Sequence, residues 1–201
     1  MSRILLITSS PRAESYSTRV ARALAQKLSE KPGSSVVLRD LTREPLPHID
    51  DTFAVARSVP ADHLTASQKA ALRLSDDLLK ELNAADTLII AAGMINFGIP
   101  STLKAYLDYI LRPGVAFRYT EKGPEGLVKG KKAYLVLARG GNYSAAPTQA
   151  FNFQDPYLRA ALGLIGISDV EVIVVEGVAF GPAAAENALS AALRQVAALA
   201  A

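Results

Sequence analysis

One continuous stretch decides the fold of this chain: Thr87-Leu88-Ile89-Ile90-Ala91-Ala92-Gly93-Met94-Ile95-Asn96-Phe97-Gly98-Ile99-Pro100-Ser101-Thr102-Leu103-Lys104. It begins with an uninterrupted apolar run, which predicts a buried strand over residues 86–92. Gly98 then permits a sharp turn. Pro100 favours a helix over residues 101–111, because the missing N–H of proline costs nothing in a first helical turn. A strand, a short loop and a helix in this order predict that the loop lies at the carboxyl edge of a parallel sheet, where open α/β sheets bind ligands.

The loop that joins this strand to the helix is uncharged and combines backbone with aromatic surface. Its central residues are Met94, Ile95, Asn96 and Phe97. Apolar pockets with a few well-placed polar groups are typical of sites for small organic molecules. The loop therefore suits a flat heteroaromatic ring better than a phosphate or a metal ion.

Strands and helices alternate along the rest of the chain. Besides 86–92, we expect strands over residues 3–8, 35–39, 133–138 and 170–176, and helices over 15–30, 65–83, 101–111, 155–165 and 182–200. With right-handed crossovers, this pattern predicts an α/β fold, with a five-stranded parallel sheet in the order 2-1-3-4-5 and helices on both faces. Such an arrangement is a flavodoxin-like three-layer sandwich. The chain length suits a single domain over residues 1–201.

Two segments extend beyond this alternation. Residues 42–64 form a polar connection, and connections of this length are uncommon unless they line a site or an interface. Residues 117–131 predict an inserted hairpin or loop that turns at Lys122-Gly123-Pro124.

The composition excludes several kinds of chemistry. The chain has no cysteine, which excludes disulfides, zinc–thiolate sites, iron–sulfur clusters and cysteine nucleophiles. Only two histidines are present, both in a polar loop region, so we expect no metal site. Any redox reaction must therefore use a bound organic cofactor.

Charge and hydropathy restrict the partners. The net charge is +3 and the basic residues are scattered, which favours small anions over nucleic acid. The start Met1-Ser2-Arg3 leads directly into a strand, and no apolar run reaches the ~20 residues that a membrane helix needs. We expect a cytoplasmic protein that does not enter membranes.

A hydroxyl-rich loop follows the first strand: Ser9-Ser10-Pro11-Arg12-Ala13-Glu14-Ser15-Tyr16-Ser17-Thr18. A helix start offers free N–H groups and a partial positive charge, so it can bind phosphate without lysine. Ordinary N-capping by Ser15 or Ser17 is the alternative. The glycines of a P-loop or of a dinucleotide-binding turn are absent. A terminal phosphate such as that of FMN therefore fits better than a pyrophosphate.

Paired glycines mark the loop after the fourth strand, Ala138-Arg139-Gly140-Gly141-Asn142-Tyr143. Glycine lets the backbone lie against a flat ligand and direct its N–H groups at it, although a plain turn is the alternative. The loops after the first, third and fourth strands meet at the same sheet edge.

Four stretches are distinctive: Asn96-Phe97-Gly98-Ile99-Pro100-Ser101-Thr102-Leu103-Lys104, Gly114-Val115-Ala116-Phe117-Arg118-Tyr119-Thr120-Glu121-Lys122-Gly123-Pro124-Glu125-Gly126-Leu127, Arg139-Gly140-Gly141 and Glu176-Gly177. In these, and over nearly the whole chain, the sequence resembles the FMN-dependent NADH-azoreductases, also called FMN-dependent NADH:quinone oxidoreductases. The resemblance implies a flavodoxin-like homodimer with one FMN per subunit near the dimer interface.

The cofactor-binding residues that we expect come from all three loops and are Ser9, Ser15, Tyr16, Ser17, Met94, Ile95, Asn96, Phe97, Arg139, Gly140 and Gly141. The resemblance implies that the first loop holds the FMN phosphate and that the second lines the isoalloxazine ring. It also implies that the two glycines face the pyrimidine end of the ring. Arg139 either touches the cofactor or forms a structural ion pair.

Three positions differ from the family pattern. Ile95 replaces a common tyrosine, and Asn142-Tyr143 replaces a common Ile-His pair. Ala161 stands where an aromatic residue commonly lies over the partner's flavin. These differences concern the substrate side of the site.

The resemblance implies hydride transfer from NADH or NADPH to N5 of FMN, and then to a quinone or an azo compound. No side chain is assigned as a catalytic acid or base. Phe117, Tyr119 and Tyr143 are candidates for the substrate pocket. An electron carrier without a small-molecule substrate and a non-catalytic flavin-binding protein remain as alternatives.

Overall fold

A computed structural model describes residues 2–199 and has one five-stranded parallel sheet at its centre. The strands are β1 (Arg3–Thr8), β2 (Ser35–Asp40), β3 (Thr87–Gly93), β6 (Lys132–Ala138) and β7 (Asp169–Val175). They lie in the order β2-β1-β3-β6-β7. This confirms the predicted order 2-1-3-4-5, because β6 and β7 are the fourth and fifth strands of this sheet.

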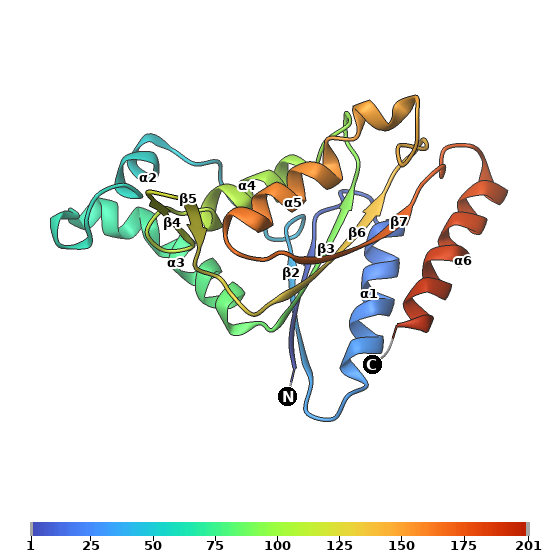
Figure 1. Cartoon of the computed structure of the whole chain (residues 1–201), viewed down its shortest axis with the longest axis horizontal. Helices are drawn as coiled ribbons and strands as arrows, with labels where there is room; N and C mark the ends of the chain where they lie inside the picture. Colours follow the sequence, from blue (N-terminus) through green and yellow to red (C-terminus); the bar gives the residue numbers. More distant parts are fainter. Residues whose placement is uncertain (1, 200–201) are drawn as a thin grey trace.

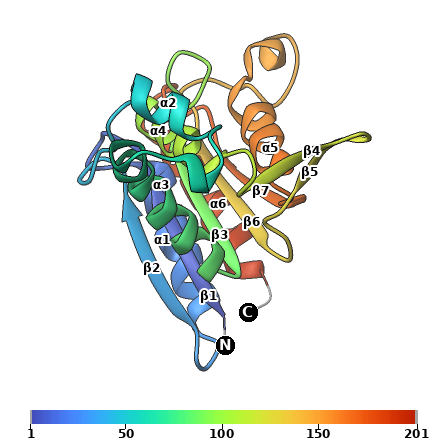
Figure 2. The same cartoon turned by 90° about the vertical axis from the view of Figure 1, so that its left-hand side faces the viewer.

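Helices cover both faces of the sheet (Figures 1 and 2). One face carries α1 (Tyr16–Ser29) and α6 (Pro182–Ala198), and the other carries α3 (Ala66–Ala84), α4 (Ser101–Ile110) and α5 (Gln154–Leu164). The predicted end of the last helix at residue 200 lies outside the described residues. Within residues 2–199, no helix is both long enough and apolar enough to cross a bilayer.

The continuous apolar run of β3 follows from its central position. Leu88 and Ile90 belong to the hydrophobic cluster beneath α3, α4 and α5. Ile89 and Ala91 belong to the cluster beneath α1 and α6. Since successive side chains of a strand point to opposite faces, a strand covered on both faces must be apolar at every position.

The long connection after β2 folds against the helices. It contains α2 (Asp51–Ala56) and the short 3₁₀ helix η1 (Ala61–His63). Phe53 of α2 is buried, and its ring meets that of Tyr109 in α4 edge-on, with centroids 4.8 Å apart. This connection therefore packs in the core on the α3–α4 side of the molecule.

The predicted insertion forms an antiparallel hairpin of β4 (Phe117–Thr120) and β5 (Gly123–Gly126). Its base is fixed to the turn that follows α5. The N–H of Val128 donates to the carbonyl of Ile165 at 2.8 Å. A Cβ at Gly126 would lie only 2.1 Å from the backbone nitrogen of Gly166, so only glycine permits this approach.

Candidate cofactor site

The loops after β1, β3 and β6 converge at the carboxyl edge of the sheet (Figure 1). Between them lies a hollow of about 280 Å³, here called the edge pocket, lined by Ser10, Arg12, Glu14, Ser15, Tyr16, Gly93, Met94, Ala138, Arg139, Gly140, Val178 and Ala179. A second hollow of about 290 Å³, the aromatic pocket, is lined by Met94, Asn96, Phe97, Gly140, Gly141 and Tyr143. Met94 and Gly140 line both hollows, so the two adjoin.

The loop after β3 is a strained, tight turn. Ile95 and Gly98 exchange two backbone hydrogen bonds, of 3.1 and 3.0 Å. The residues between them, Asn96 and Phe97, have φ of 46° and 70°. Non-glycine residues rarely adopt such left-handed conformations, and strained backbone of this kind concentrates at functional sites.

Several backbone donors around the two pockets have no acceptor. Within residues 2–199, no hydrogen bond is donated by the N–H groups of Tyr16, Ser17, Asn96, Phe97, Gly140 or Gly141. Backbone N–H groups are obligatory donors, and those near a binding pocket are normally completed by water or by ligand. The donors of α1 stand at a helix start with no acidic residue in its first turn, which favours an anion.

The hydroxyl groups of Ser9, Ser15 and Ser17 form hydrogen bonds within the protein. The hydroxyl of Ser9 is buried and donates to the carbonyl of Ala91 at 2.9 Å. Ser15 caps α1 by accepting from the N–H of Thr18 at 3.2 Å, and its hydroxyl lies 3.1 Å from that of Ser17. The capping interpretation of Ser15 is therefore confirmed. Ser9 and Ser17 do not line either pocket, whereas Ser15 and Tyr16 line the edge pocket.

Arg139 is the largest fully buried side chain and organises the loop after β6. Its Nε donates to Oε1 of Gln154 at 3.2 Å, and its Nη1 lies 3.5 Å from a carboxylate oxygen of Glu176. That oxygen also accepts from the N–H of Tyr143 at 3.0 Å. Desolvation lowers the pKa of the Arg139 guanidinium, and the Glu176 carboxylate opposes this effect. The structural ion pair considered for Arg139 is thus present, and its side chain holds the loop from within.

A fourth loop, after β7, was missed as part of the site. The N–H groups of Val178 and Ala179 donate to the carbonyls of Arg139 and Gly140, at 3.3 and 3.0 Å. These contacts carry Val178 and Ala179 into the wall of the edge pocket. The position of this loop at the carboxyl end of the fifth strand was the available signal. Ser10, Arg12 and Glu14 were missed as well.

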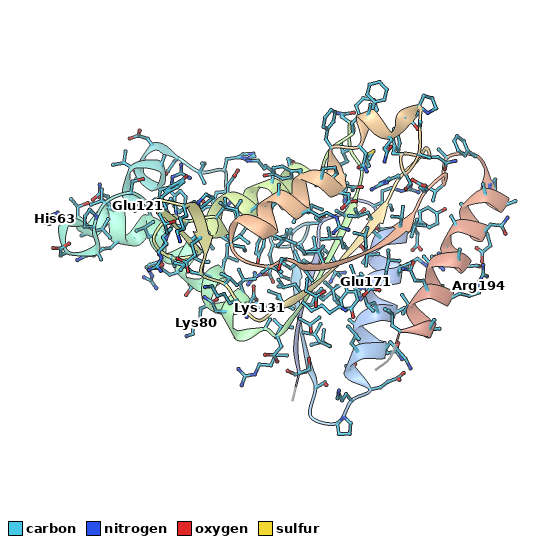
Figure 3. All side chains as sticks on the ribbon, viewed as in Figure 1. His63, Lys80, Glu121, Lys131, Glu171 and Arg194 are labelled. Atoms are coloured by element: carbon cyan, nitrogen blue, oxygen red, sulfur yellow. The ribbon has the colours of Figure 1, made fainter. Side chains whose placement is uncertain are left out.

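Two of the three substrate-pocket candidates lie elsewhere. Phe117 is packed in the hydrophobic cluster beneath α3, α4 and α5. Tyr119 is 75% exposed on the hairpin, and Figure 3 shows Glu121 at the turn of that hairpin, far from the loop that carries residues 140–153. Tyr143 does line the aromatic pocket. Ala161 lies in α5 and is buried within a single chain.

Metal-ligating side chains are dispersed. In the part of the chain that the structure describes, no three His, Asp or Glu side chains come together as a metal site.

Comparisons with known proteins identify the family. The model of a family described as having a flavodoxin-like fold matches residues 2–200. An "FMN-dependent NADH:quinone oxidoreductase 1" from Rhizobium etli is 57% identical over 98% of this chain and 97% of its own length. A protein from Agrobacterium fabrum with the same activity in its name is 50% identical over 98% of this chain and 97% of its own.

Solved structures give the same result. The crystal structure of an azoreductase from Bacillus anthracis has a TM-score of 0.90 and 30% identity, covering 98% of this chain and 97% of that one. An FMN-dependent NADH-azoreductase from the same species, solved in complex with FMN, has a TM-score of 0.86 and 26% identity over the whole of both chains. The chain therefore belongs to the flavodoxin-like family that contains the FMN-dependent NADH:quinone oxidoreductases and azoreductases.

Proposed function

We propose that this protein is an FMN-dependent oxidoreductase that passes a hydride from NADH or NADPH to quinones and azo compounds. One observation carries the proposal: unpartnered backbone donors surround two adjoining hollows, one at a helix start and the other between an uncharged aromatic turn and two glycines. FMN matches this arrangement, because it has a phosphate at one end for the helix start and a flat ring at the other for the aromatic turn.

The phosphate end belongs at the start of α1. The free N–H groups of Tyr16 and Ser17 and the partial positive charge of the helix would bind it. Arg12 also lines the edge pocket and offers a positive charge, beside the carboxylate of Glu14 in the same lining. Ser9, Ser15 and Ser17 would support this end indirectly, because their hydroxyls hold the loop and the helix start in place.

The ring end belongs in the aromatic pocket. Met94 and Phe97 offer apolar surface there, and the N–H groups of Asn96, Gly140 and Gly141 are free to donate to polar ring atoms. When bound, FMN supplies the hydride chemistry: N5 accepts a hydride from the nicotinamide and donates it to the acceptor. Donors near Gly140 and Gly141 would stabilise negative charge on the ring, which is the protein's electrostatic contribution.

The substrate face is lined by aromatic side chains. The ring of Phe97 lies 6.0 Å from that of Tyr143 and 5.3 Å from that of Phe151, measured between centroids. Phe97 and Phe151 are both exposed. Such a surface would let the nicotinamide and then a planar quinone or azo compound stack in turn on the ring.

The absorbance spectrum of the purified protein and a steady-state assay test the proposal. We expect a yellow protein that releases FMN on denaturation and oxidises NADH when a benzoquinone is added. A protein that stays colourless after incubation with FMN would contradict it. A yellow protein without turnover would instead support the electron carrier or the non-catalytic flavin protein.

We also propose that the protein is a cytoplasmic homodimer. Four phenylalanines on or next to the site loops, Phe97, Phe151, Phe153 and Phe180, are between 42% and 66% exposed. Apolar surface concentrated in this way is typical of a protein interface. A second subunit on this rim would also close the aromatic pocket from water.

A further inference from the structure

A third hollow, here called the arginine pocket, lies on the β2 side of the first loop. Its volume is about 250 Å³, and it is lined by Thr8, Ser10, Pro11, Arg12, Ala13, Thr18, Arg22, Asp40, Thr42 and Arg43. Ser10 and Arg12 also line the edge pocket, so the two hollows adjoin across the first loop. The proposed positions of the FMN phosphate and ring leave the arginine pocket without a role.

The lining of this pocket is strongly basic. It contains three arginines against one acidic side chain, Asp40. Within residues 2–199, Arg12 and Arg22 form no ion pair, and Arg43 approaches Asp40 only to 3.8 Å. Asp40 is engaged in shaping the turn after β2, because its Oδ1 accepts from the N–H groups of Thr42 and Arg43, at 3.0 and 3.3 Å. Arg12 is assigned above to the FMN phosphate, so Arg22 and Arg43 are the guanidinium groups available to a second anion.

Thr8 lines the same pocket and carries a hydroxyl that, among the described residues, lacks a hydrogen-bond partner. Thr8 is only 2% exposed, and within the described chain its Oγ1 has no hydrogen-bond partner. A buried polar group without a partner is unfavourable and rare in folded proteins. A ligand oxygen that reached this hydroxyl would satisfy it. Guanidinium groups recognise phosphate oxygens well because their N–H groups form a planar fork.

We propose that the arginine pocket is a binding site for the phosphate group of a nucleotide. Two sources share this chemistry. The first is the adenosine half of the reduced nicotinamide dinucleotide, whose phosphates would extend from the ring pocket past the first loop. This source rests on the function proposed above. The second is a free nucleotide, which would occupy the pocket as a separate ligand.

Direct titration tests the pocket itself. AMP and inorganic phosphate are titrated calorimetrically into the FMN-loaded protein, so that the FMN phosphate site is already filled. We compare the wild type with the double variant Arg22→Gln/Arg43→Gln. Loss of even one charge-assisted hydrogen bond should weaken AMP binding by about tenfold. Arg19→Gln is the matched control, because Arg19 is an exposed arginine of the same helix that does not line the pocket.

The choice of hydride donor separates the two sources. NMNH lacks the adenosine half of NADH, so the ratio of kcat/KM for NADH to that for NMNH measures what that half contributes. If the double variant lowers this ratio about tenfold, the donor uses the pocket. If AMP binding weakens and the ratio does not change, the source is a free nucleotide and the phosphate site stands.

Two results would overturn the phosphate site: no AMP or phosphate binding by an active wild type, or equal binding by the double variant. A wild type that binds no FMN would contradict the proposed function instead. The same titration on the FMN-free protein would then still test the pocket.

The variant Thr8→Val provides a second readout. Since valine has nearly the same shape and removes the unpartnered hydroxyl, the melting temperature of the ligand-free protein should not fall. AMP binding should nevertheless weaken. A lower melting temperature with unchanged AMP affinity would show that the hydroxyl is structural.

Discussion

At the scale of single residues, the site depends on a backbone conformation that few side chains adopt. Asn96 and Phe97 hold left-handed φ values, and asparagine adopts that region more readily than most residues. Phe97 is the less expected occupant. Its ring contacts Tyr143 and Phe151, and its carbonyl accepts from the N–H of Phe153 at 3.1 Å. The loop after β6 therefore holds the turn in its strained form.

Two substitutions at Asn96 should distinguish the contribution of its backbone conformation to FMN binding from that of its side-chain amide. We expect Asn96→Val to weaken FMN binding strongly, because a β-branched residue at positive φ adds strain of ~1–3 kcal/mol and the amide is lost. Asn96→Gly relieves the strain but also removes the amide, so any remaining loss in that variant reports the amide alone. Quenching of FMN fluorescence measures both. Wild-type affinity in both variants would place the ring elsewhere.

Substitution of Arg139 should destabilise the loop after β6, because the buried side chain of Arg139 holds that loop in place. Arg139→Met removes the hydrogen-bond partner of the buried Gln154 side chain and the ion-pair partner of the partly exposed Glu176. Leaving a buried polar group without its partner costs about 1–3 kcal/mol of unfolding free energy. Urea denaturation of the FMN-free protein measures this, which separates stability from cofactor binding. Arg159→Met is the control. Arg159 pairs with Asp155 on the surface of α5, and surface pairs contribute only ~0–1 kcal/mol. Equal losses would contradict the assigned role of Arg139.

At the scale of elements, the start of α1 should respond to charge with opposite signs in stability and binding. Tyr16→Asp places a carboxylate in the first turn, which stabilises a helix by ~0.3–1 kcal/mol. The same charge repels an incoming phosphate. Tyr16→Asn removes the aromatic ring without adding the charge, so it isolates the electrostatic part. Tyr16 also packs against the hydrophobic cluster beneath α1 and α6, so both variants lose that contact. Relative to Tyr16→Asn, we expect Tyr16→Asp to have an equal or higher melting temperature without FMN, together with much weaker FMN binding. Full FMN retention by both variants would move the phosphate away from α1.

The hairpin depends on the contact between two glycines. We expect Gly126→Ala to lift β4 and β5 from the turn after α5, because its Cβ would meet backbone atoms of Gly166 and Ile165 at 2.1 to 2.3 Å. Overpacking typically costs about 1–3 kcal/mol, and more where backbone must move. Thermal melting tests this against Gly163→Ala in α5. Nothing lies within 4 Å of a Cβ there, so alanine should be neutral or stabilising.

Strands and helices were predictable because their signals are local. The alternation of Leu88 and Ile90 with Ile89 and Ala91 between two clusters explains why an unbroken apolar run predicts a central strand. The turn at Asn96 and the glycines at 140 and 141 were predictable for a related reason, since strand ends of a parallel sheet share one edge.

Side-chain directions in the site were not predictable from local pattern. Ser9 and Tyr16 both lie in a hydroxyl-rich loop, but only the packing against β3 decides that the Ser9 hydroxyl turns inward to Ala91. The aromatic character of Phe117 does not distinguish core from pocket, and tertiary packing places it in the core. Likewise, the bond between Arg139 and Gln154 joins residues that meet only once α5 has docked.

At the scale of the whole molecule, one rim of the sheet carries both the site and the exposed phenylalanines. We expect the wild type to have the mass of a dimer by light scattering, and Phe151→Ser/Phe153→Ser to shift it towards the monomer. Loss of a large aromatic anchor at an interface typically costs 2 kcal/mol or more, about a thirtyfold loss of affinity. Val36→Ser is the control, because Val36 is an exposed apolar residue of β2, an edge strand. A monomeric wild type would contradict the proposed dimer.

Helix α5 gives the molecule a mechanical property. Its first residue, Gln154, is tied to Arg139 beneath the loop of Gly140 and Gly141, and the turn after its last residue is tied to the base of the hairpin. A helix of 11 residues resists stretching and compression, because every turn is closed by backbone hydrogen bonds. It therefore connects the hairpin rigidly to the loop after β6. We therefore expect a change that displaces the hairpin to alter the position of Arg139 and of the two glycines that follow it.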